Sequence, residues 1–196
     1  MVQQWIQREG QVLGPEFLRV DGFLNHRIAP AFISEVGRRL AERFGGLDVR
    51  CILTAEAAGN IVAYELARRL DARALYAKKG KAATMTRPMT RTVVSPTKGT
   101  RTELSISRDY LGPEYRVLIV DDFLYHGTTS AALADMVNES GATLVGFGFV
   151  IEKAFADGRA ALERFGVPVV PLVSIEAMDV STGEVRFARG SDGSGT

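Results

Sequence analysis

Short apolar runs alternate along the chain with segments of helical periodicity. The clearest helical segment begins at Pro30, a residue that a first helical turn tolerates. Its apolar positions form one stripe, namely Ile33, Val36, Leu40 and Phe44. Runs rich in β-branched residues, such as 117–120, are typical of buried strands. The alternation predicts an α/β fold with a doubly wound, mainly parallel sheet flanked by helices.

The other predicted elements follow one another with short connections. Helices are expected at 2–8, 60–70, 130–140 and 158–165. Strands are expected at 50–54, 74–77, 91–94, 103–106, 117–120, 143–151, 169–175 and 184–187. The strands at 91–94 and 103–106 would form a β-ribbon that projects from the α/β units.

The pattern predicts a single domain over residues 1–189. An apolar but irregular arm at about 1–28 and the strands within 166–189 do not belong to the α/β units. We expect them to form a small hood above the carboxyl edge of the sheet, although the arm could equally serve only to close the core. Residues 190–196 are rich in glycine and serine, so we expect a disordered tail there.

Composition narrows the range of functions. The net charge of +1 gives no sign of a surface for nucleic acid or for an anionic membrane. The single cysteine, Cys51, rules out an internal disulfide framework. The start of the chain lacks a signal-peptide core, and the longest apolar run, 144–151, is too short to span a bilayer. We therefore expect a cytoplasmic protein, either an enzyme or a binding protein.

The strongest chemical signal is a strand, loop and helix in the middle of the chain. The strand at 117–120 is followed by two carboxylates, Asp121 and Asp122, and then by a short loop that contains Gly127. The N–H groups and positive dipole end of the next helix suit a phosphate, and the carboxylates can accept hydrogen bonds from vicinal sugar hydroxyls. The segment therefore suits a ribose 5-phosphate. The pattern alone equally allows a solvated aspartate pair before a capped helix.

Two further segments could contribute to an anion site. A second strand-to-helix turn consists of Glu56, Ala57, Ala58 and Gly59. Such a turn can bind phosphate through its backbone, although most of them hold no ligand. A lysine cluster, formed by Lys78, Lys79 and Lys81, precedes a tract at 82–107 that is rich in threonine and arginine. Polar tracts of this length are usually functional or mobile, so we expect a mobile anion-binding lid, with a solvated hairpin as the alternative.

The stretch from Val117 to Thr129 resembles the phosphoribosyl diphosphate (PRPP) signature of type I phosphoribosyltransferases. It has four apolar residues, two acidic residues and a loop with glycine and threonine. The resemblance extends over about 10–187 with similar spacing and is closest to the bacterial xanthine-specific branch of that family. The loop departs from the family at Tyr125 and His126, where small residues are usual, so we assign no catalytic role to His126.

The resemblance implies a role for each part of the site. The catalytic acidic pair is Asp121 and Asp122. The 5-phosphate of PRPP would be bound by the loop residues Tyr125, His126, Gly127, Thr128 and Thr129. Pyrophosphate would be bound by Lys79 and by Glu56, Ala57, Ala58 and Gly59, where alanines replace the hydroxyl residues common in relatives. The base would be held by the residues that match Leu18, Asn25 and Lys153.

The implied reaction joins xanthine to the ribose 5-phosphate of PRPP and releases pyrophosphate. Mg²⁺ would be bound through PRPP rather than by protein ligands, and the enzyme would act as a homodimer in purine salvage. Lys153 can only donate hydrogen bonds, so it suits a 6-oxopurine and opposes the 6-amino group of adenine; without the resemblance it would be a surface lysine.

Two alternatives stay open. One is a transferase for guanine, hypoxanthine, adenine or orotate. The other is a non-catalytic, PRPP-sensing regulator. Such regulators carry an added DNA-binding module, and because the α/β units begin by about residue 30, we expect no room for one here.

Overall fold

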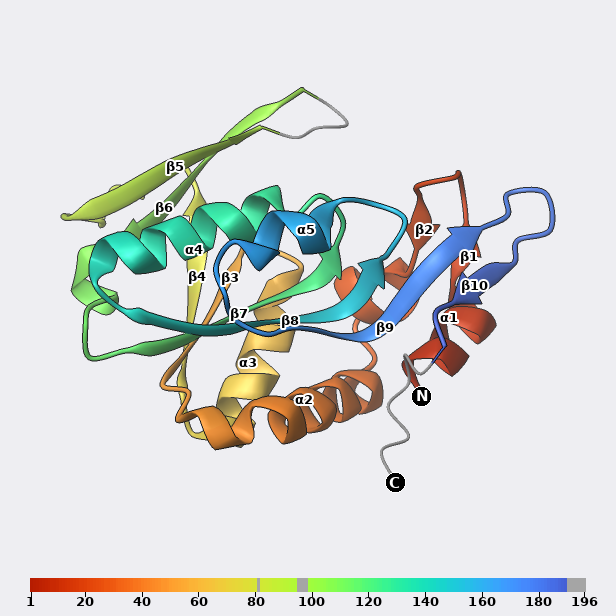
Figure 1. Ribbon diagram of the computed structural model, residues 1–196, viewed down its shortest axis with the longest axis horizontal. Coiled ribbons are helices and arrows are strands. Elements are labelled where there is room, and N and C mark those ends of the chain that lie inside the picture. Colours follow the sequence, from red (N-terminus) through yellow and green to blue (C-terminus); the bar gives the residue numbers. More distant parts are fainter. Residues whose placement is uncertain (81, 95–98, 190–196) are drawn as a thin grey trace.

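The computed structural model describes residues 1–80, 82–94 and 99–189, and its centre is an eight-stranded sheet (Figure 1). The strands lie in the order β10-β9-β8-β7-β3-β4-β6-β5. Their bounds are β3 Cys51–Ala55, β4 Arg73–Lys79, β5 Pro88–Val94, β6 Arg101–Ser107, β7 Arg116–Leu124, β8 Thr143–Lys153, β9 Val169–Met178 and β10 Val185–Phe187. A small separate sheet pairs β1 (Gln11–Val12) with β2 (Leu18–Arg19).

Helices cover both faces of the large sheet. Their bounds are α1 Val2–Glu9, α2 Pro30–Phe44, α3 Gly59–Leu70, α4 Thr128–Ser140 and α5 Gly158–Glu163. In Figure 1, α2 and α3 lie on one face and α4 and α5 on the other. The central strands β4, β3, β7, β8 and β9 are parallel, whereas β5, β6 and β10 add antiparallel edges. The predicted doubly wound, mainly parallel fold is confirmed.

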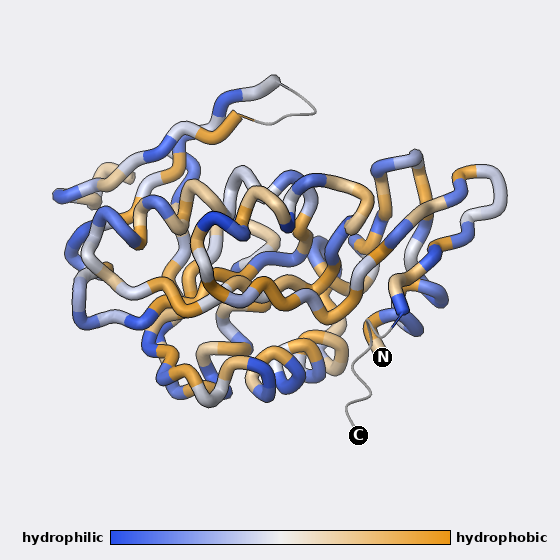
Figure 2. Tube along the Cα trace, in the orientation of Figure 1, coloured by the Kyte–Doolittle hydropathy of each residue, from blue (hydrophilic) through white to orange (hydrophobic). Residues whose placement is uncertain are grey.

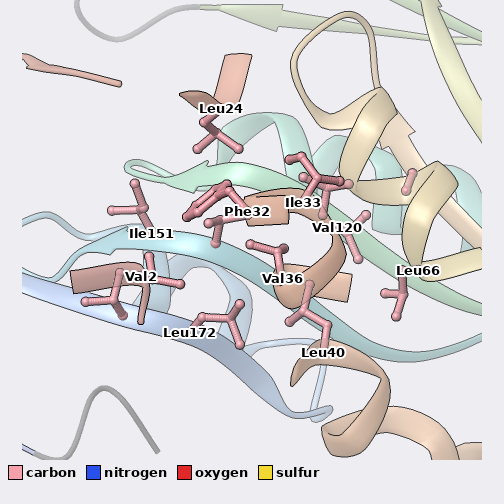
Figure 3. Packing of buried hydrophobic residues seen from close by; sticks show 14 of the residues in the cluster. Val2, Leu24, Phe32, Ile33, Val36, Leu40, Leu66, Val120, Ile151 and Leu172 are labelled. Carbon is pink, nitrogen blue, oxygen red and sulfur yellow. The ribbon is translucent and has the colours of Figure 1, made fainter. Parts of the chain in front are cut away.

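Helix α2 packs on the sheet through its predicted apolar stripe, part of which Figure 3 shows. Phe44 ends the stripe and is buried. Below its ring, β8 carries two glycines: a Cβ added at Gly146 would lie 2.8 Å from the ring, and one at Gly148 would lie 3.2 Å from it. The glycines therefore allow the helix to approach the sheet closely. Burial of one such large side chain contributes about 1.5–3 kcal/mol.

The opposite face has a core of its own between the sheet, α4 and the β5–β6 ribbon. Met89, Leu104 and Ile106 of the ribbon are buried there, and Figure 2 shows the central strands as the most hydrophobic part of the chain. The ribbon predicted within 82–107 is thus anchored by apolar residues, while the lid positions 95–98 lie outside the described residues. Cys51 belongs to the same core, and burial raises the pKa of its thiol to about 12.

Two strands run further than the hydrophobic pattern indicates. The pattern ends β7 before the acidic pair, but the pairing of β7 with β8 continues to Leu124. Likewise β4 continues past Ala77 to Lys79, because its end pairs with β6. The sequence places a loop between the acidic pair and a helix that begins at residue 130. That loop is shorter at both ends than expected: it covers only 125–127, because the two carboxylates lie within β7 and α4 begins at Thr128.

The N-terminal arm (residues 1–28) lies beside the end of the sheet formed by β9 and β10 (Figure 1). Trp5 of α1 forms an aromatic cluster with Phe23 and Phe32, with ring centroids 4.9, 5.4 and 5.5 Å apart. The arm is therefore tied to the core between α2 and the sheet, and its role as a hood over a ligand stays a prediction. None of the described helices is long and apolar enough to cross a bilayer.

Candidate active site

A cavity of about 410 Å³ lies beyond the carboxyl ends of β3, β4 and β7, the edge at which open α/β sheets bind ligands. Two turns form its walls: the β3–α3 turn (residues 56–58) and the β7–α4 turn (residues 125–127). The predicted residues that line it are Glu56, Ala57, Ala58, Lys79, Asp121, Asp122, Tyr125, His126, Gly127, Thr128 and Thr129. Segments far apart in the sequence thus meet at one site.

The β7–α4 turn brings the start of α4 to the cavity. Gly127 has a φ of +70°, and a Cβ there would lie 2.8 Å from the carbonyl oxygen of Gly158. Both facts require glycine. Helix α4 then begins at Thr128, and the first N–H groups of a helix have no partner within it. Together with the positive end of the helix dipole, they form a favourable place for a phosphate.

The two carboxylates of β7 have different surroundings. Asp122 accepts a hydrogen bond from the side-chain amide of Asn25 at 2.9 Å and another from the N–H of Phe123 at 3.0 Å. Asp121 accepts one from the N–H of Asp122 at 2.9 Å. Burial, and after it the charge of Asp122, raises the pKa of Asp121 well above its ordinary value. Asp121 therefore keeps a proton more readily than an exposed aspartate does, and when protonated it can donate as well as accept.

The β3–α3 turn presents mainly backbone. Its one charged residue, Glu56, accepts a hydrogen bond from the N–H of Lys79 at 2.6 Å, and the peptide bond after Glu56 is cis. A Cβ added to Gly59, the first residue of α3, would lie 2.0 Å from Thr54 Oγ1 and 2.9 Å from Asp121 Oδ1. Glycine therefore allows α3 to start directly against the acidic strand.

The lysine cluster is divided between two cavities. Lys79 lines the site, whereas Lys78 lines a second cavity of about 310 Å³ together with Tyr76 and Tyr110. Side chains alternate along a strand, so neighbouring lysines on β4 face opposite sides. Lys81 lies outside the described residues. Of the two cluster lysines that the structure describes, Lys79 is the one that lines the site.

The three predicted base-binding residues do not line the cavity, but Asn25 and Lys153 contact residues that do. Lys153, at the end of β8, donates to the backbone carbonyl of Glu16, and its Nζ lies 4.6 Å from the centroid of the Tyr125 ring. Burial lowers the pKa of Lys153. Asn25 reaches the site through its hydrogen bond to the acidic pair. Leu18 is buried on β2 in the N-terminal arm and does not line the cavity.

Comparison with known proteins agrees with this geometry. The family model of the phosphoribosyl transferase domain matches residues 27–183. The chain belongs to the phosphoribosyltransferase family. It is 43% identical over 183 residues to a xanthine phosphoribosyltransferase of Heliobacterium modesticaldum, and the aligned region covers 93% of this chain and 96% of that one. It is also 43% identical over 175 residues to one of Deinococcus deserti, which covers 89% and 91% of the two chains.

Solved structures of phosphoribosyltransferases share the fold. An adenine phosphoribosyltransferase of Trypanosoma brucei superposes with a TM-score of 0.76 at 18% identity, over 88% of this chain and 79% of that one. Another, of Rhodothermus marinus, gives a TM-score of 0.71 at 22% identity, over 88% and 98%. At these identities the likeness concerns the fold alone.

Some residues around this phosphoribosyltransferase site were not indicated by the sequence. His126 Nδ1 lies 2.6 Å from a carboxylate oxygen of Asp157, and Arg159 makes two 2.8 Å hydrogen bonds to Glu152. The available signal was that an aspartate directly precedes a predicted helix, which is an N-cap position. That signal indicates where the helix begins, but it does not predict a contact between the aspartate and the β7–α4 turn.

Proposed function

We propose that this phosphoribosyltransferase joins xanthine to the ribose 5-phosphate of PRPP, forming xanthosine 5-phosphate and pyrophosphate. The observation that carries the proposal is the meeting of two strand-to-helix turns at one cavity, with the acidic pair between them. The relatives at 43% identity support xanthine as the base. We expect the enzyme to act in purine salvage as a cytoplasmic homodimer, and a monomer in analytical ultracentrifugation would contradict that expectation.

Each part of the cavity would bind one part of PRPP. The start of α4, with Thr128 and Thr129, would bind the 5-phosphate. The acidic pair would bind the ribose hydroxyls, and the β3–α3 turn with Lys79 would bind the pyrophosphate. The bond from C1 to pyrophosphate oxygen breaks, and a bond from C1 to a base nitrogen forms as that nitrogen loses its proton. Positive charge develops on the sugar and negative charge on the leaving group, so positioning and electrostatics supply the catalysis.

Magnesium fits this cavity as a partner of the substrate. Within the described residues, no three histidine, cysteine, aspartate or glutamate side chains form a group that could hold a metal ion. The carboxylates of Glu56, Asp121 and Asp122 at the cavity are oxygen donors, the type that Mg²⁺ prefers, and Mg²⁺ usually keeps substrate phosphates and water as ligands. We infer that the ion would be bound through PRPP, with these carboxylates able to hold its water ligands, and that it would supply positive charge near the pyrophosphate.

Base choice provides the direct test. The Lys153 ammonium matches a 6-oxo acceptor but faces the 6-amino group of adenine donor to donor, which costs about 1–3 kcal/mol, or roughly ten- to a hundredfold in kcat/KM. Pyrophosphate release should be measured with PRPP and xanthine, guanine, hypoxanthine, adenine or orotate in turn. A kcat/KM for adenine equal to that for xanthine would refute the base assignment. Binding of PRPP without turnover of any base would favour the regulator.

The substitution Lys153→Gln sharpens this test. Glutamine can accept a hydrogen bond from the 6-amino group as well as donate one, so the xanthine-to-adenine ratio of kcat/KM should fall by about tenfold. Lys78→Gln is the matched control, because Lys78 lines the other cavity and its replacement should leave the ratio unchanged.

We further infer that the β5–β6 ribbon closes over bound PRPP. Val93, Thr102 and Leu104 of the ribbon already line one side of the cavity, and closure would keep water from the cationic sugar. Proteolytic cleavage within 82–107 should slow when PRPP and Mg²⁺ are present. Equal cleavage rates with and without them would contradict a lid.

A further inference from the structure

The β7–α4 turn carries the imidazole of His126, a residue that the family resemblance places at the 5-phosphate without saying what its side chain does. The imidazole of His126 lines the cavity, and its Nδ1 lies 2.6 Å from Oδ1 of Asp157. The Asp157 carboxylate makes no capping hydrogen bond to α5, although it directly precedes that helix. The Asp157 carboxylate is therefore oriented towards the β7–α4 turn rather than towards α5.

The chemistry of this contact fixes the orientation of the ring. An ionised carboxylate only accepts hydrogen bonds, so Nδ1 carries the proton between the two side chains. The hydrogen bond from His126 lowers the pKa of Asp157, which keeps this carboxylate ionised. In the part of the chain that the structure describes, Nε2 makes no hydrogen bond to protein. Nδ1 is thus held by Asp157, whereas Nε2 is available to a ligand in the cavity.

The start of α5 is held tightly against the turn. A Cβ added to Gly158 would lie 2.1 Å from the carbonyl oxygen of Tyr125, so the two backbones are in direct contact. Arg159 donates two 2.8 Å hydrogen bonds to the buried Glu152, which also accepts one of 2.5 Å from Ser174. This network ties the first turn of α5 to β8 and β9. Asp157 consequently holds His126 from a fixed position.

We propose that His126 donates a hydrogen bond from Nε2 to the 5-phosphate of PRPP and that Asp157 is its positioning residue; this inference rests on the proposed function. An imidazolium can donate from both nitrogens, one to the carboxylate and one to the phosphate. Hydrogen bonds between charged groups are about twice as strong as neutral ones. His126 would add a side-chain N–H donor to a subsite in which the helix start otherwise supplies backbone N–H groups and threonine hydroxyls.

Direct binding of PRPP, measured by titration calorimetry, tests the proposal independently of turnover. His126→Asn should weaken PRPP binding by about tenfold. His126→Gln should weaken it less, because the longer glutamine side chain places its donor NH2 about where the imidazole Nε2 lies, whereas the asparagine amide falls short of that position. Asp157→Asn should weaken binding by about threefold or more, while the start of α5 is preserved because the Asp157 side chain makes no capping hydrogen bond that the substitution could remove. At saturating PRPP, the KM for xanthine should stay unchanged in all three variants.

A double variant separates positioning from general damage. If Asp157 acts through His126, the variant with both His126→Asn and Asp157→Asn should bind PRPP no more weakly than His126→Asn alone. Asp135→Asn is the matched control, since Asp135 of α4 pairs with Arg164 at the far end of α5 at 3.1 Å. It should leave PRPP affinity unchanged.

Three outcomes would overturn the proposal. The first is an unchanged PRPP affinity in His126→Asn. The second is a double variant whose loss of PRPP affinity is the product of the two single losses. The third is a loss of PRPP affinity in Asp135→Asn as large as that in Asp157→Asn. An unmodified protein that binds PRPP but converts no base would refute the proposed reaction and still allow this binding test. An unmodified protein that does not bind PRPP would refute both.

Discussion

The two turns that face each other across the cavity contribute different kinds of group. The β7–α4 turn and its flanks present side chains: two carboxylates, two threonine hydroxyls and an imidazole. The β3–α3 turn presents mainly backbone, because two alanines precede a glycine that packs against Thr54 and Asp121. Both turns lead into a helix, so each offers N–H groups to an anion.

The difference concerns what each turn must recognise. In the proposed reaction, ribose hydroxyls require directed acceptors, and the carboxylates of β7 would supply them. A pyrophosphate that departs during the reaction can be held by backbone N–H groups, provided that the chain approaches closely. Replacement of polar side chains should therefore impair ligand binding at the β7–α4 turn, whereas added bulk should impair ligand binding at the β3–α3 turn.

The largest expected effect is on the acidic pair. Asp121→Asn combined with Asp122→Asn should lower turnover by about a thousandfold or more, since the sugar loses its charged acceptors. The fold should persist, because asparagine is close in shape to aspartate. Turnover assays together with circular dichroism check both parts. Near-normal turnover in the folded double variant would show that this strand does not bind the sugar.

The second turn should be sensitive to a single methyl group. Gly59→Ala places a Cβ 2.0 Å from Thr54 Oγ1, so α3 must shift away from the acidic strand. We expect a loss of about 1–3 kcal/mol in stability and a loss of about tenfold or more in PRPP affinity. Gly46→Ala is the control, because a Cβ there meets nothing within 4 Å. Equal effects of the two substitutions would contradict the close approach of the β3–α3 turn.

A smaller effect concerns stability and pH. A group with a raised pKa in the folded state binds its proton more tightly when folded, so folding is favoured at low pH and loses stability as pH rises. The pKa of Asp121 is raised by burial, so Asp121→Asn should increase the melting temperature at neutral pH. The gain should shrink as the pH is lowered and disappear below about pH 4, the ordinary pKa of aspartate, where the carboxyl is protonated in both states. A gain that is independent of pH would point to a different cause.

The smallest effect is expected from Ala58→Ser. This change adds a hydroxyl to the turn that works through its backbone, so PRPP affinity should change by less than about threefold. Calorimetric titration of the variant measures the change. A gain above about tenfold would mean that the turn lacks a side-chain donor that it could readily use.

The sequence predicts the strand, turn and helix at the centre of the candidate site, because its signal there is local. An apolar run, the acidic pair and Gly127 stand next to one another, and each constrains the same strand, turn and helix. The end of β7 could not be predicted from that run, because its last residues are held by pairing with β8. The division between Lys78 and Lys79 follows from strand alternation, but only once β4 is known to reach them.

The contacts that support the β7–α4 turn from behind could not be predicted from the sequence. His126 and Asp157 are 31 positions apart, and Glu152 meets Ser174 at a distance of 22 positions. Such contacts depend on where α5 packs against the sheet, and the hydrophobic periodicity of the sequence does not determine that position. The resemblance to the family implied roles for residues at the ligand but none for the residues that support them.

The buried state of Cys51 has a practical consequence for spectroscopy. Maleimides react with the thiolate, and a thiol with a pKa of about 12 is almost wholly protonated at neutral pH. Although the chain contains one cysteine, the folded protein should behave towards such reagents as if it contained none. A fluorophore attached through Val94→Cys, at the 46% exposed end of β5, would then report on the ribbon alone and could follow its movement in real time.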